Sequence, residues 1–185
     1  GHIALYTAIH SPSSLESLIL MAPAGIETFD AEDRKFLKNV FNAELIQSFD
    51  EQRIRLNFYA NFYEMPADAE FMIEDRLRMK EDTAAYARYA QMIPLCVEGM
   101  LSDTVFQDLQ KIHVPAMVVY GKQDNLIPNK YLHPDISTAD IAERAKARIA
   151  GAELHLIDKA GHFVHWEQAE RVNSLVKAHL DKVNP

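Results

Sequence analysis

Two patterns of hydrophobic and polar positions alternate along the chain. Short, mostly apolar runs lie at residues 18–21 (LILM) and 114–121 (VPAMVVYG), and a third short strand is expected at 153–158 (ELHLID). Such runs are typical of strands buried on both faces, as in a parallel sheet. Helix-forming stretches lie before, between and after the strands, at 2–10, 138–150 and 167–183. This alternation predicts an α/β fold with a mostly parallel sheet and flanking helices.

A long helical insertion separates the first two strands. From residue 27 to about residue 101 charged residues are dense, and apolar residues recur at helical spacing, as at Phe36, Val40 and Phe41. Pro66 suits the start of a helix, and Pro94 is expected to kink or end one. We therefore predict core segments at 1–26 and 102–185, with a helical insertion at 27–101.

Composition excludes some classes of binding partner and cofactor. The chain has 19 Lys and Arg against 27 Asp and Glu, a net charge of −8, which argues against nucleic acid and anionic membranes as partners. Its single cysteine, Cys96, permits no internal disulfide, and the eight histidines share no metal-ligand spacing.

No apolar run approaches the ~20 residues that span a bilayer. We expect a cytoplasmic protein. Because Gly1 follows no initiator methionine, we also expect a segment of a longer chain.

Polar side chains follow two of the predicted strands. Asp124 lies in the loop YGKQDNLIP (120–128), and His162 lies in AGHFVHWE (160–167). Catalytic groups of parallel α/β sheets lie beyond the carboxyl ends of the strands, so neighbouring strands would bring these two side chains together. A carboxylate beside an imidazole fixes its tautomer and stabilises the imidazolium that forms when histidine removes a proton. The pair still needs a nucleophile and an oxyanion hole.

With these motifs the chain resembles the α/β-hydrolase family, from just after the nucleophile elbow to the C-terminus. GHIALYTAIHSPSSLESLILMAPAG is similar to the helix and strand after the elbow. VPAMVVYGKQDNLIP is similar to the acid strand and its loop, and AGHFVHWEQAERVN to the histidine loop, although Ala169 stands where a proline is common. The resemblance implies that Asp124 and His162 are two members of a catalytic triad and that the insertion is a helical cap.

The resemblance also implies an activity. We expect a carboxylesterase-like serine hydrolase that acts on a small ester or related acyl compound, with its serine before Gly1 and no metal or organic cofactor. The N-terminal half of the fold would be required for activity, the partner would be a small-molecule substrate, and a homodimer is left open. An aspartate nucleophile would instead indicate an epoxide hydrolase or dehalogenase. A hydrolase-fold protein that binds a ligand without turnover is a further alternative.

Several residues carry competing interpretations. Asp158 and Asp30 are alternative acids of the triad. Asp158 ends the strand expected at 153–158, and Asp30 follows the strand expected at 18–21. We interpret Asp158 as a turn or cap group. The aromatic residues of the insertion, such as Phe58 and Tyr89, fit core packing between helices or the wall of a substrate pocket, and the sequence does not separate these roles.

Overall fold

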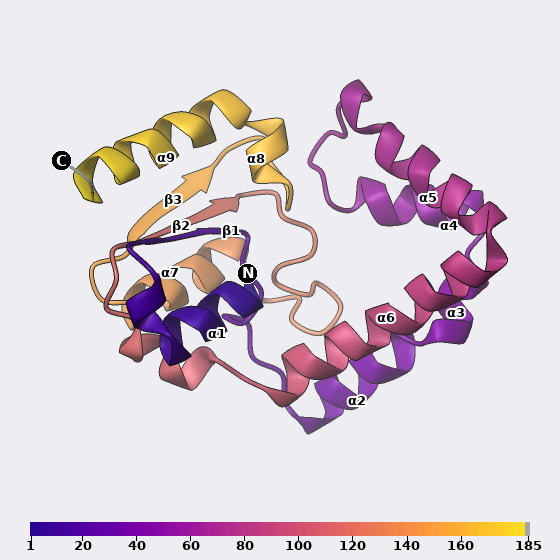
Figure 1. Ribbon diagram of the computed structural model, residues 1–185, viewed down its shortest axis with the longest axis horizontal. Coiled ribbons are helices and arrows are strands. Elements are labelled where there is room, and N and C mark those ends of the chain that lie inside the picture. The colour runs from indigo at the N-terminus through magenta and orange to yellow at the C-terminus, as the bar shows by residue number, and fades with distance from the viewer. Residues whose placement is uncertain (184–185) are drawn as a thin grey trace. The chain divides into compact units, whose positions relative to one another are not determined.

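The computed structural model describes residues 1–183 and divides into two compact units (Figure 1). The sheet unit comprises Gly1–Thr28, Asn61–Glu64 and the chain from Val105 onward. The helical unit comprises Phe29–Ala60 and Met65–Thr104. Residues 61–64 therefore belong to the sheet unit, although both of their flanks belong to the helical unit.

Three parallel strands form the sheet, in the order β1–β2–β3. They are β1 (Leu18–Met21), β2 (Ala116–Gly121) and β3 (Glu153–Ile157). Leu20 pairs with Val118, and Val119 pairs with His155. Every residue of the central strand β2 is buried, as expected for a strand covered on both faces. The predicted parallel α/β architecture is confirmed.

Helices cover both faces of this sheet (Figure 1). On one face, Val118 and Tyr120 of β2 belong to a core cluster that also includes residues of α1 (His2–His10) and α7 (Thr138–Arg148). On the other face, Met117 and Val119 share a second cluster with residues of α8 (Val164–Glu167) and α9 (Ala169–Val183). The two-residue period of a strand divides β2 between the clusters. Two short 3-10 turns, η1 (Pro12–Ser14) and η3 (Phe106–Lys111), complete the unit.

Helices, most of them capped by side chains, make up the second unit. They are α2 (Ala31–Val40), α3 (Ala43–Gln47), α4 (Glu51–Tyr59), the 3-10 turn η2 (Ala67–Ala69), α5 (Phe71–Glu81) and α6 (Thr83–Ser102). Side chains of Asp30, Asn42, Asp50 and Asp82 accept hydrogen bonds from first-turn amides of α2, α3, α4 and α6. Pro94 does not end a helix, because α6 runs through it to Ser102. Among the residues described, no helix is long and apolar enough to cross a bilayer.

The carboxyl end of β2 lies against the backbone of the loop after β3. A Cβ atom at Gly121 would lie 2.2 Å from the carbonyl oxygens of both Ala160 and Gly161, whereas one at Gly99, inside α6, would meet nothing within 4 Å. The absence of a side chain at position 121 therefore lets two loops approach each other.

We expect the variants Gly121→Ala and Gly99→Ala to change stability in opposite directions. Gly121→Ala forces backbone apart and should lower the free energy of unfolding by about 1–3 kcal/mol or more. Gly99→Ala removes unfolded-state freedom within a helix and should raise it by about 0.4–1 kcal/mol. Urea unfolding of the two variants measures both effects, and equal stability of the two would contradict the close approach at Gly121.

Candidate active site

The carboxylate of Asp124 is fixed in a buried position beyond β2. The amides of Leu126 and Ile127 donate hydrogen bonds to its Oδ1, at 2.8 and 3.0 Å. Its side chain is 0% exposed, and Oδ2 lies 3.0 Å from Nδ1 of His162. One oxygen is thus held by the backbone of its own loop, and the other is directed at the imidazole.

His162 lies in the turn after β3, and this turn is bonded to the loop of Asp124. Lys122 N donates to the carbonyl of Ile157 at 2.8 Å, and Gln123 N donates to that of Ala160 at 3.0 Å. Because the carboxylate accepts, Nδ1 of His162 is the donor and Nε2 is left as the basic nitrogen. The side chain is 24% exposed, so the imidazole is accessible to a reacting group.

A third side chain, Glu167, holds the histidine turn in place. Its Oε2 accepts from Gly161 N at 2.6 Å, and its Oε1 accepts from Tyr63 N and Glu64 N at 2.9 Å each. The carboxylate therefore joins the histidine turn to the segment 61–64. Phe163 N adds a bond to the carbonyl of Asn61 at 3.0 Å.

Sequence reasoning assigned no such role to Glu167. Its partners are backbone amides, two of them about a hundred residues away, and backbone amides leave no trace in side-chain patterns. A Cβ atom at Gly161 would lie 2.7 Å from Phe62 C and Tyr63 N, so a glycine is required where the two segments cross.

A second carboxylate–imidazole contact lies on the opposite side of the Asp124 loop. Glu27, in the loop after β1, has a 7% exposed side chain and lies 2.5 Å from Nδ1 of His133. The same carboxylate accepts from Asn129 N, at 2.9 and 3.1 Å from its two oxygens. Glu27 thus braces the loop that carries Asp124. The sequence does not indicate this contact, because His133 and Glu27 belong to no shared motif.

The buried phenol of Tyr120 lies near the loops that carry Asp124 and Glu27. The hydroxyl of Tyr120 donates to the carbonyl of Pro23 at 2.9 Å. Burial raises the pKa of Tyr120 well above its usual range, and the charges of Asp124 and Glu27 raise it further. Tyr120 therefore stays protonated and links β2 to the loop after β1.

The competing acids have other partners. Asp30 caps α2 by accepting from Glu32 N and Asp33 N, at 2.8 and 2.9 Å. Asp158 pairs with Lys122 at 2.7 Å, and this contact lowers the pKa of the Asp158 carboxyl. Of the sequence candidates, the structure brings together Asp124 and His162. Across residues 1–183, no group of three or more His, Cys, Asp or Glu side chains is arranged to hold a metal ion.

The chain is similar to known hydrolases over nearly its whole length. A family model described as "Alpha/beta hydrolase family" matches residues 1–175. Monoacylglycerol lipase ABHD6 from Bos taurus is 25% identical over 196 residues, covering 100% of this chain and 53% of the relative. A protein of Paraburkholderia xenovorans named 2-hydroxy-6-oxononadienedioate/2-hydroxy-6-oxononatrienedioate hydrolase is 24% identical, covering 95% of this chain and 57% of the relative.

A solved structure has the same fold. The crystal structure of a probable hydrolytic enzyme from Pseudomonas aeruginosa matches with a TM-score of 0.77 at 18% identity, covering 97% of this chain and 60% of that one. At this identity the likeness concerns the fold alone. The chain spans little more than half the length of the curated relatives it matches.

We expect Glu167→Ala to destabilise the sheet unit. The substitution leaves three amides without their charged acceptor, which should lower the free energy of unfolding by about 2–3 kcal/mol. Thermal or urea unfolding measures the change. Glu143→Ala, on the exposed side of α7, is the matched control and should stay within about 0.5 kcal/mol of the parent. Equal stability of the two variants would show that Glu167 does not hold the turn.

Proposed function

Because the chain belongs to the alpha/beta hydrolase family, we propose that the whole protein is a serine hydrolase that cleaves small, largely apolar esters or related acyl compounds. The observation that carries the proposal is the 3.0 Å contact between the buried carboxylate of Asp124 and Nδ1 of His162. The names of the curated relatives, a lipase and another hydrolase, support hydrolysis as the reaction class.

In the proposed mechanism, His162 is the general base and Asp124 stabilises its charged form. A serine from the part of the protein before Gly1 attacks the carbonyl carbon, and its hydroxyl proton passes to Nε2 of His162. The imidazolium is stabilised by the carboxylate on Nδ1 and returns its proton to the departing alcohol as the ester C–O bond breaks. Water then repeats the sequence on the acyl-serine, releasing the acid and restoring the serine.

The buried position of Asp124 suits this role. Two backbone amides hold one of its oxygens, so the carboxylate orients His162 without being free to rotate away. Its water-excluded surroundings strengthen its attraction for an imidazolium relative to the same pair in water. In this proposal the helical unit takes the part of the family's cap, and no metal or organic cofactor takes part in the reaction.

Labelling with a fluorophosphonate tests the nucleophile. We expect the full-length protein to react covalently at a serine before Gly1, and His162→Ala to slow labelling by orders of magnitude because the serine then lacks its base. Peptide mapping by mass spectrometry locates the modified residue. Absence of labelling, or modification that is unaffected by His162→Ala, would contradict a serine activated by this histidine.

A matched pair of acid variants tests the role of Asp124. Asp124→Asn should reduce kcat for a p-nitrophenyl ester by about 10⁴-fold, because the amide favours the wrong imidazole tautomer. Asp158→Asn is the control: it removes a carboxylate that also follows a strand of the sheet but pairs with Lys122 and not with His162. This variant should leave kcat near the parent value. Similar losses in both variants would remove Asp124 from the mechanism.

A further inference from the structure

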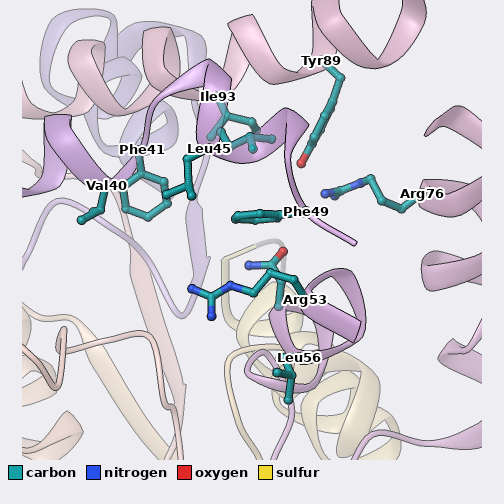
Figure 2. Close-up of a pocket in the computed structure, with 11 residues that line it drawn as sticks. Val40, Phe41, Leu45, Phe49, Arg53, Leu56, Arg76, Tyr89 and Ile93 are labelled. Carbon is teal, nitrogen blue, oxygen red and sulfur yellow. The ribbon is translucent and has the colours of Figure 1, made fainter. Parts of the chain in front are cut away.

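The helical unit contains a cavity of its own, of about 470 Å³ (Figure 2). This volume lies within the range of about 300–1,000 Å³ found for small-molecule sites. Every lining residue belongs to the helical unit. Much of the wall is apolar and comes from α2, α4 and α6 and the segment around α3, including Val40, Phe41, Leu45, Leu56 and Ile93.

Two arginines supply the charge of this cavity. The guanidinium of Arg76 lies 4.1 Å from the ring centroid of Tyr89 and 5.0 Å from that of Phe58. The guanidinium of Arg53 lies 5.6 Å from the ring of Phe49; Figure 2 shows Arg53 below this ring and Arg76 to its right. The residues lining the cavity include no aspartate or glutamate.

The partners of these arginines differ from those of their neighbours. Arg55, two residues from Arg53, pairs with both Glu51 and Glu70. Within the described part of the chain, Arg53 and Arg76 form no ion pair with a carboxylate; their charged groups lie on aromatic rings instead. Arg53 is exposed and Arg76 is half-buried, and a ring contact does not neutralise a guanidinium, so both charges remain available to an anion.

The shape of the guanidinium indicates which anion fits. A guanidinium that stacks through its faces keeps its N–H donors in the plane at its edge, and two of them match the oxygens of a carboxylate. Tyr89 adds a donor, because its hydroxyl points toward Arg76 in Figure 2. Burial raises the pKa of Tyr89, so the phenol stays protonated. The chain as a whole carries −8, which makes a cationic cavity a local exception to an anionic surface.

We propose that this cavity binds a small amphiphilic carboxylate, with the carboxylate at Arg76 and the apolar part against Val40, Leu45 and Ile93. The site is separate in residues from Asp124 and His162 and does not require their chemistry. Two sources could supply the same ligand chemistry: a free carboxylic acid, or an ester that carries a second, anionic end.

Calorimetric titration of the full-length protein with decanoate tests the site. We expect saturable binding to the parent and to His162→Ala alike, because the cavity does not depend on the hydrolytic residues. Arg76→Gln should weaken binding at least about tenfold, the loss expected for a charge-assisted hydrogen bond. Arg78→Gln is the control on the same helix: its side chain is 72% exposed and lies outside the cavity, so decanoate binding should be unchanged.

Two further arms guard against misfolding and against non-specific binding. Arg76→Lys keeps the charge and the cation–π contacts but lacks the planar fork, so it should fold as the parent while still binding decanoate several-fold more weakly. Decanol, which has the same chain without the charge, should bind the parent more weakly than decanoate and be insensitive to Arg76→Gln. Equal binding of decanol and decanoate, unchanged affinity in Arg76→Lys and Arg76→Gln, or no saturable binding would overturn the proposal.

The source of the carboxylate is distinguished by titrating His162→Ala, which by the proposed function leaves esters intact, with two p-nitrophenyl esters. If an ester supplies it, an ester with a distal carboxylate binds as tightly as decanoate, Arg76→Gln in the same background weakens this binding, and binding of the neutral ester does not depend on Arg76. If a free acid supplies it, decanoate binds more tightly than either ester and Arg76→Gln weakens the binding of decanoate. Both results support the site. If the parent protein binds decanoate but hydrolyses no ester, the result would contradict the proposed hydrolase activity and leave the proposed binding site intact.

Discussion

The contact between Asp124 and His162 requires two loops to be held together at hydrogen-bonding distance, and the loop after β2 is the element on which this depends. On one side Asp124 of this loop reaches His162 after β3; on the other side Asn129 and His133 bind Glu27 after β1. Each contact joins the loops of neighbouring strands, so the order β1–β2–β3 determines which side chains can meet. The central strand is buried on both faces, which keeps the base of its loop rigid.

The two carboxylate–imidazole contacts are alike in chemistry and differ in what surrounds them. Glu27 shares its carboxylate between a backbone amide and His133, and therefore acts as a brace between loops. Asp124 uses one oxygen for backbone amides and keeps the other for His162, whose side chain is a quarter exposed. Exposure does not separate the two histidines, because the side chain of His133 is 18% exposed and that of His162 is 24% exposed. The proposed choice of His162 as the base rests instead on its loop, which resembles the histidine loop of the hydrolase family.

The fold and the central pair of the site could be predicted because both depend on local patterns. The apolar runs at β1 and β2 predict buried parallel strands, and the polar loops beyond β2 and β3 identify Asp124 and His162. The brace of Glu27 and the bonds from Glu167 to the amides of Tyr63 and Glu64 could not be predicted, because these partners lie about a hundred residues away and include backbone groups. The third amide, of Gly161, is six residues from Glu167, but a backbone donor leaves no side-chain pattern. Pro94 was expected to kink or end a helix, and the second outcome is wrong because α6 continues to Ser102; a local propensity of about 3 kcal/mol against proline was outweighed by its context.

The distribution of charge separates the two units chemically. In the sheet unit the carboxylates near His162 are the buried Asp124 and the half-buried Glu167, each bound by backbone amides, which suits the proposed development of positive charge on this histidine. In the helical unit the cavity has only arginines as its charged groups, and they lie on aromatic rings. The arginines of the cavity would favour binding of a molecule that is negative at one end and apolar elsewhere, whereas the carboxylates near His162 would repel its negative end. The chain thus combines the proposed proton-transfer pair, which gains from nearby negative charge, with a cavity suited to an anion, and the two share no residue.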